Sequence, residues 1–139
     1  MAPKRDSLNP DDFETIARLR VALRRFQSAT DAVTAAHGLT PRQYDLLAVL
    51  RAPSRGVAVA SAIADELYIS RNAMTELVSR AEKAGLVLRS GDQTDARRKP
   101  IAATPDGSRR YRAAAKELGP GRKQLLGLLK EAAESAKIS

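Results

Sequence analysis

Three consecutive cations, Arg97, Arg98 and Lys99, lie at the expected tip of a β-hairpin, where the second of two short strand-like segments begins. A turn between strands needs no charge of its own, so these side chains indicate an anionic partner such as nucleic acid. The stretch from Arg89 to Arg112 holds seven Lys or Arg residues against three Asp, which is +4 of the chain's net charge of +8. A basic surface that merely faces solvent would have the same composition.

A second set of polar residues opens an expected helix. Its members project away from the apolar side of that helix, and they are Ser70, Arg71, Asn72, Thr75 and Ser79. Arg can bond guanine O6 and N7, Asn can pair with adenine N6 and N7, and the Thr methyl can meet the thymine methyl. Free N–H groups at a helix start favour phosphate. Any solvent-exposed helix face carries similar residue types, so this set alone is a weak signal.

The elements around these residues predict a winged helix-turn-helix in a mainly α fold with a small β-hairpin. A short helix over roughly 59–67 is followed by a tight turn at Tyr68 and a helix over 70–85, with strands at 86–90 and 99–103. Apolar residues recur in the second helix at i, i+3, i+4 and i+7, and they are Met74, Leu77, Val78 and Ala81. In such folds the second helix enters the major groove and the hairpin reaches the neighbouring backbone or minor groove.

The terminal helices are expected to join two subunits. Residues 1–9 are polar and expected to be disordered, and a single helix is expected over 10–38, which at about 1.5 Å per residue would be close to 40 Å long. A body of 139 residues cannot cover the apolar stripe of so long a helix, which predicts a partner subunit. A last helix after residue 119 has more leucines than one packing face uses, namely Leu125, Leu126, Leu128 and Leu129.

Composition argues against several classes of protein. There is no Cys, which excludes disulfides and thiolate metal sites and fits a cytoplasmic protein. No apolar run approaches the roughly 20 residues of a membrane helix, and the N-terminus does not have the pattern of a secretory signal. The single His, His37, cannot supply a triad or a metal cluster, and it is expected at the exposed end of the first helix. We therefore expect no enzyme activity, no metal and no cofactor.

Several short motifs occur in a fixed order. "IS" precedes the helix over 70–85, "LV" lies within it and "EKAGLVLR" leaves it, and then come Asp95-Ala-Arg97 in the hairpin and "TPDG" at the next helix. This order resembles the MarR (multiple antibiotic resistance regulator) family of bacterial transcription factors. The likeness extends weakly to "LTPRQYDLLAVL" and to the long first helix, so it covers most of the chain.

The resemblance implies a homodimer that binds a pseudo-palindromic DNA duplex. Regions 10–38 and 104–139 would form the helical dimerisation region and 39–103 the winged helix-turn-helix, within one compact domain. In the family, the Arg at the position of Arg97 reaches into the minor groove, and the Asp at the position of Asp95 helps to orient the wing. Closeness on one hairpin makes Arg89 or Arg97 a candidate ion-pair partner of Asp95.

The family also implies regulation by a small molecule. A small aromatic or anionic effector would release a repressor from DNA, and Tyr44 and Tyr111 are candidates for lining its pocket. Packing in the core is the commoner fate of such residues and is the favoured interpretation.

The sequence departs from the family pattern at two positions. Ala103 stands where Leu is usual, and Glu76 stands where a basic residue is frequent. Glu76 could accept from cytosine N4, repel phosphate, or pair with Arg80 at i+4, which is the favoured interpretation. Two other functions therefore stay open beside sequence-specific regulation: a non-specific architectural nucleic-acid-binding protein and a winged-helix protein-interaction module.

Overall fold

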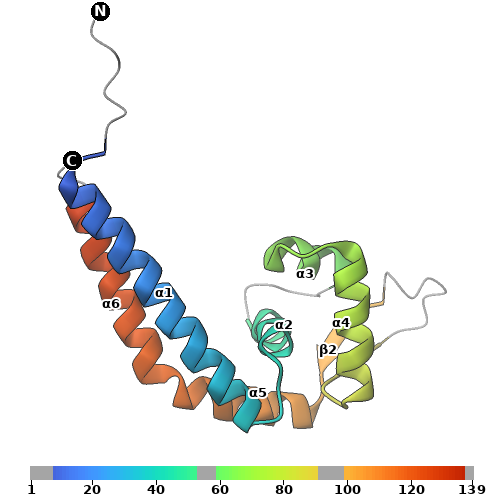
Figure 1. Cartoon of the computed structure of the whole chain (residues 1–139). Coiled ribbons are helices and arrows are strands. Elements are labelled where there is room, and N and C mark those ends of the chain that lie inside the picture. Colours follow the sequence, from blue (N-terminus) through green and yellow to red (C-terminus); the bar gives the residue numbers. More distant parts are fainter. Residues whose placement is uncertain (1–7, 53–58, 91–98, 137–139) are drawn as a thin grey trace, which may run out of the picture. The chain divides into compact units, whose positions relative to one another are not determined.

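The computed structural model describes residues 8–52, 59–90 and 99–136. Within these ranges the chain is mainly helical with one two-stranded antiparallel sheet, which confirms the predicted fold class (Figure 1). The elements are α1 (Pro10–Ala36), α2 (Pro41–Arg51), α3 (Ala60–Leu67), α4 (Arg71–Lys83), β1 (Val87–Arg89), β2 (Ile101–Ala103), α5 (Pro105–Glu117) and α6 (Gly119–Ala136). Contacts divide the chain into two compact units, Asp31–Glu117 and the pair Met1–Thr30 with Leu118–Ser139. We call the first the winged unit and the second the helical-pair unit.

Side-chain caps fix the starts of the helices that frame the winged unit. The Thr40 hydroxyl accepts from the Gln43 N–H at 3.1 Å while the Thr40 N–H donates to the Gln43 side chain at 3.0 Å, a reciprocal capping box. The Ser70 hydroxyl accepts from the Ala73 N–H at 3.1 Å and so begins α4. Gly85, at φ +74°, follows the end of α4, where a left-handed residue favours glycine.

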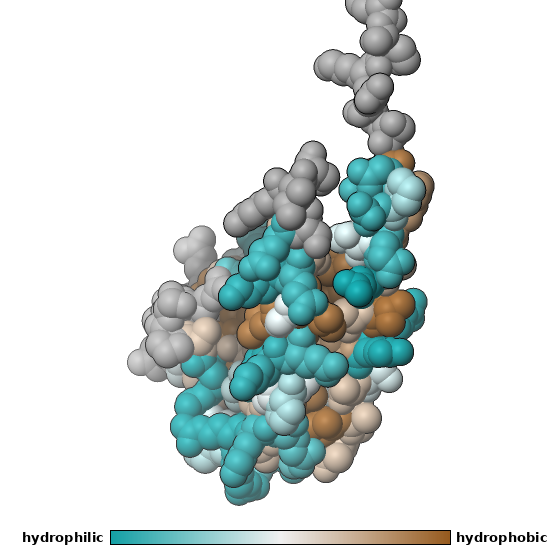
Figure 2. Space-filling model, turned by 90° about the vertical axis from the view of Figure 1, so that its left-hand side faces the viewer, coloured by the Kyte–Doolittle hydropathy of each residue, from teal (hydrophilic) through white to brown (hydrophobic). Residues whose placement is uncertain are grey.

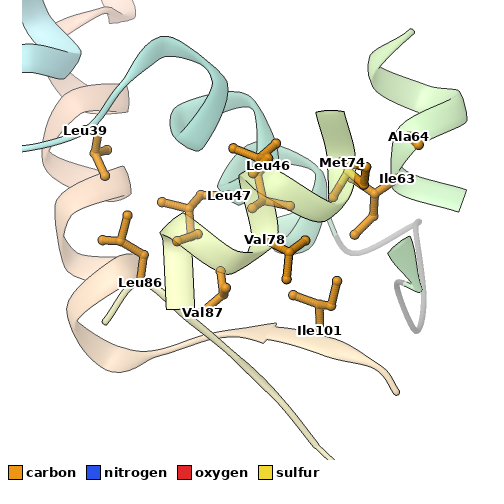
Figure 3. Packing of buried hydrophobic residues seen from close by; sticks show 12 residues of the cluster. Leu39, Leu46, Leu47, Ile63, Ala64, Met74, Val78, Leu86, Val87 and Ile101 are labelled. Carbon is orange, nitrogen blue, oxygen red and sulfur yellow. The ribbon is translucent and has the colours of Figure 1, made fainter. Parts of the chain in front are cut away.

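The core of the winged unit is built on the predicted apolar stripe of α4. All four of its residues, Met74, Leu77, Val78 and Ala81, are buried. Leucines of α2, Ile63 of α3 and Ile101 of β2 point toward the same interior (Figure 3). Since α4 lies with one whole side in this core, its polar residues are held on the opposite side.

The hairpin and the start of α5 meet at a close backbone contact. Val87 pairs with Ala103 across the two strands. Next to this pair the Thr104 hydroxyl donates to the Gly85 carbonyl at 2.6 Å and accepts from the Gly107 N–H at 3.0 Å. Gly107 is buried, and a Cβ added to it would collide with the carbonyl oxygen of Leu86.

We expect Gly107→Ala to destabilise the protein. Relief of the collision requires the backbone at Leu86 to move, and overpacking of this kind costs about 1–3 kcal/mol. The measurement is the midpoint of thermal unfolding at a fixed protein concentration. Gly127→Ala in α6 is the matched control, because a Cβ there meets nothing within 4 Å and alanine favours a helix. Equal midpoints for the Gly107→Ala variant and the wild type would contradict the close approach.

In the helical-pair unit, α1 and α6 lie side by side and run in opposite directions (Figure 1). Asn9 and Asp12 cap the start of α1 by two reciprocal hydrogen bonds of 2.9 and 3.0 Å. Large apolar side chains of both helices remain more than a third exposed, and these are Phe13, Ile16, Val21, Leu23, Leu126 and Leu128. A view from the side of these helices shows hydrophobic surface between hydrophilic side chains (Figure 2).

The helical-pair unit also holds a groove between its two helices. Mostly apolar residues line it, among them Ala22, Phe26 and Leu125. In the described part of the chain, no helix combines the length and the apolar character needed to cross a membrane.

Candidate nucleic-acid interface

The outer face of α4 gathers most of the polar residues that the sequence singled out. Arg71, Asn72 and Thr75 lie on this face and are all exposed, and Ser79 is half-buried. A shallow hollow runs along this face, lined by Asn72, Thr75, Glu76, Ser79, Arg80 and Lys83. We call these residues together with Arg71 the α4 polar face. Arg80 and Lys83 were absent from the predicted site, although their spacing of one to two turns beyond Glu76 could have indicated them.

Local hydrogen bonds decide which groups of the α4 polar face are available to a ligand. Just before this face, the Ser70 hydroxyl accepts from the Ala73 N–H and can still donate its own proton. The Thr75 hydroxyl donates to the Arg71 carbonyl at 3.0 Å. The methyl of Thr75 is therefore the group available for an apolar contact.

One ion pair lies within the α4 polar face. Arg80 Nη2 is 2.6 Å from Glu76 Oε1, which is the i,i+4 pairing favoured from the sequence. Their side chains are 72% and 63% exposed, so water screens the pair and it adds little to stability. The anion nevertheless offsets one cation of this face.

A second ion pair ties the hairpin to the end of α4. Arg89 Nε of β1 lies 3.2 Å from Glu82 Oε1, and the Arg89 side chain is only 22% exposed. This contact fixes the direction in which β1 leaves the helix. Sequence reasoning missed Glu82, although the reversal at Gly85 folds the strand back along the helix and brings the two side chains together.

The tip of the hairpin is only partly described. Lys99 is half-buried, two residues before β2 begins at Ile101. The predicted wing residues Asp95, Arg97 and Arg98 lie outside the described residues, and so does any pairing of Asp95 with Arg89 or Arg97.

The tyrosines proposed for an effector pocket form a ring pair. The ring centroids of Tyr44 on α2 and Tyr111 on α5 are 5.1 Å apart, with the planes tilted by 40°. Both side chains are half-buried and pack against the core of the winged unit. Asp45 follows Tyr44 in the chain; partial desolvation raises the pKa of its carboxyl, and the carboxylate of Asp31 raises that pKa further. Their contact with the core is the packing role that the sequence also allowed, and their contact with an effector stays a prediction.

His37 directly follows the end of α1, as expected, but it is half-buried and has a partner. Its side chain is 23% exposed, and Nε2 lies 2.9 Å from Glu117 Oε1 at the end of α5. A contact across 80 residues of sequence gives no local pattern, so helix periodicity could not predict it. Among the described residues no group of three or more His, Cys, Asp or Glu is placed to hold a metal ion.

Comparison with known proteins identifies the winged unit. A family model described as "MarR family" matches residues 37–98, a segment that includes α2, α3, α4 and β1. Residues 37–98 belong to the MarR family. The match includes α4 and its polar face. It agrees with the resemblance to the MarR family that the sequence motifs indicated.

Solved structures of other proteins share the fold of this chain. AbsC, a MarR family transcriptional regulator from Streptomyces coelicolor, has a TM-score of 0.73 at 20% identity, over 95% of this chain and 91% of that one. A point mutant of MepR from S. aureus, solved bound to an oligodeoxyribonucleotide, has a TM-score of 0.63 at 23% identity, over 86% and 87%. At these identities the likeness establishes the fold.

Two curated relatives match shorter segments. A putative transcriptional regulatory protein for the hcr operon of Thauera aromatica is 32% identical over 82 residues, 59% of this chain and 48% of that protein. The HTH-type transcriptional regulator PapX of Escherichia coli is 29% identical over 84 residues, 60% of this chain and 51% of that protein. The matches thus span about half the length of these relatives.

Proposed function

We propose that this MarR-family chain is a sequence-specific, double-stranded DNA-binding transcriptional regulator that acts as a homodimer in the cytoplasm. The α4 polar face carries the proposal, because the core occupies the opposite side of α4 and holds its side chains outward on a rigid element. One α4 from each subunit would enter one of two major grooves about one helical turn apart. Arg97, Arg98 and Lys99 would hold the flanking minor groove and phosphates.

Known relatives support the regulatory part of this proposal. The two curated relatives are named as transcriptional regulators, and one MepR structure contains an oligodeoxyribonucleotide. We further propose that the protein is a repressor and that a small aromatic or anionic effector, bound near Tyr44 and Tyr111, releases it from DNA.

The proposed dimer would use the helical-pair unit. Its exposed apolar residues, such as Phe13 and Leu126 at 59% and 61% exposure, would be covered by the same helices of a second copy. Large apolar side chains exposed together on one unit favour association, because burying them removes apolar surface from water.

Selection of bound duplexes from a random pool, followed by competition, tests the function. A sequence-specific regulator enriches one inverted repeat and keeps its preference for that site when salt weakens all binding, with a slope of about −0.9 per phosphate neutralised. A non-specific architectural protein would enrich no site. A protein-interaction module would bind no duplex at all.

Removal of the carboxylate from the α4 polar face should strengthen duplex binding. We expect Glu76→Gln to raise affinity for non-specific DNA about fivefold, since one unfavourable interaction with phosphate of about 1 kcal/mol disappears and Arg80 is released. Thermal stability should hardly change, because an exposed i,i+4 pair contributes only a few tenths of a kcal/mol.

Glu14→Gln is the matched control for that variant. Glu14 forms the same kind of exposed i,i+4 pair with Arg18 at 3.6 Å, on α1 rather than α4. The Glu14→Gln variant should leave DNA affinity nearly unchanged. Fluorescence anisotropy measures the DNA affinity of both variants. A drop in affinity for a cytosine-containing selected site with Glu76→Gln would instead assign Glu76 to base reading.

A further inference from the structure

Tyr68 occupies the left-handed backbone conformation, which favours glycine. It has φ 54° and ψ 43°, and it is the one non-glycine residue with positive φ in the described ranges. The Tyr68 N–H donates to the Asp65 carbonyl at 3.4 Å and the Ile69 N–H to the Ala64 carbonyl at 3.1 Å, the pattern that closes a helix through a left-handed residue. A side chain with a Cβ is strained in this position.

The ring of Tyr68 does not stabilise the fold by burial. Its side chain is 97% exposed, while Leu67 and Ile69 on either side are half-buried against the core of the winged unit. Neither burial nor packing against the described residues therefore accounts for an aromatic residue at this turn.

The turn lies at the end of α4 that would face DNA. Tyr68 is two residues before Ser70, the cap of α4, and Arg71 and Asn72 open the first turn of that helix (Figure 1). A helix that enters the major groove by its N-terminal end brings the residues just before its cap close to a sugar–phosphate strand. A phenol O–H donates readily to a phosphate oxygen, and the ring can lie against a sugar.

We propose that Tyr68 anchors the DNA backbone beside the recognition helix. Its hydroxyl donates a hydrogen bond to a phosphate of the strand that passes the start of α4, which fixes how far the helix enters the groove. The anchor is neutral, so it adds affinity without releasing counterions. This inference rests on the proposed DNA-binding function and adds one contact to it.

Tyr68→Phe and Tyr68→Gly test the anchor, because each should weaken DNA binding without lowering the stability of the fold. Both variants should bind the selected duplex and a scrambled duplex about tenfold more weakly, as expected for a lost hydrogen bond to a charged group. The dependence of affinity on salt should keep the wild-type slope, because no cation is removed. The unfolding midpoint should be unchanged in Tyr68→Phe and unchanged or higher in Tyr68→Gly, since glycine relieves the strained turn.

The outcomes separate this inference from the proposed function. Wild-type protein that binds no duplex would overturn both. Wild-type protein that binds, together with a Tyr68→Phe variant of equal affinity, would overturn the anchor alone. A lower unfolding midpoint in Tyr68→Gly would also overturn it, because the ring would then serve the fold.

Discussion

Replacement of Ile16 and Leu23 by glutamate is expected to convert the protein to monomers and to weaken its binding to a two-half-site duplex by about 10²–10⁴-fold. The two residues lie seven apart on one side of α1, and they are 46% and 40% exposed in the single chain. A second copy would bury them, and buried unpaired carboxylates oppose that contact. Loss of the dimer also removes the gain from binding two half-sites at once.

Sedimentation and fluorescence anisotropy on the same samples measure this effect. The control variant, Arg24→Gln with Ser28→Glu, changes the net charge by the same −2 at exposed positions of α1. It should remain dimeric and lose only the small affinity that follows from its charge. A dimer that survives the Ile16→Glu and Leu23→Glu changes would place the subunit contact elsewhere.

Substitution of alanine for Arg71 or Asn72, in the first turn of α4, is expected to reduce the preference for one DNA sequence. Arg71→Ala and Asn72→Ala should each weaken binding to the selected duplex by about 1–3 kcal/mol, or roughly 5- to 150-fold, if each side chain reads a base through two hydrogen bonds. Neither residue belongs to the buried core, so the unfolding midpoint should stay close to that of the wild type.

Comparison of the selected duplex with a scrambled one separates base reading from charge. Asn72→Ala should change only the affinity for the selected duplex, whereas Arg71→Ala should also weaken the scrambled one slightly. Arg24→Ala, which removes an exposed cation of α1, is the matched control and should keep the full preference. A preference that survives Asn72→Ala would show that Asn72 does not read the site.

Local patterns made the framework of the winged unit predictable. The positions Met74, Leu77, Val78 and Ala81 are set by helix periodicity, and all four are buried as expected. The caps at Thr40 and Ser70 depend on residues three positions away, and both hydrogen bonds are present. Such features are visible in sequence because the interacting groups are close along the chain.

Contacts between distant segments and backbone torsions could not be predicted in this way. The pair of His37 with Glu117 joins residues 80 positions apart, and the pair of Arg89 with Glu82 depends on the backbone reversal at Gly85. The exposed, left-handed Tyr68 follows from how α3 closes, and helix periodicity carries no sign of it. The roles of Asp95, Arg97 and Arg98 remain predictions from the sequence.

The spacing of the two half-sites tests the central claim most directly, because two α4 helices in one dimer must face the same side of the duplex. The affinity of the wild-type protein is measured by anisotropy for the selected inverted repeat and for versions lengthened at its centre by about five and about ten base pairs. We expect the five-base-pair insertion, which turns the half-sites to opposite sides, to weaken binding by about a hundredfold or more, and the ten-base-pair insertion to weaken it less. Equal affinity for all three duplexes would contradict a two-fold assembly that reads DNA through paired recognition helices.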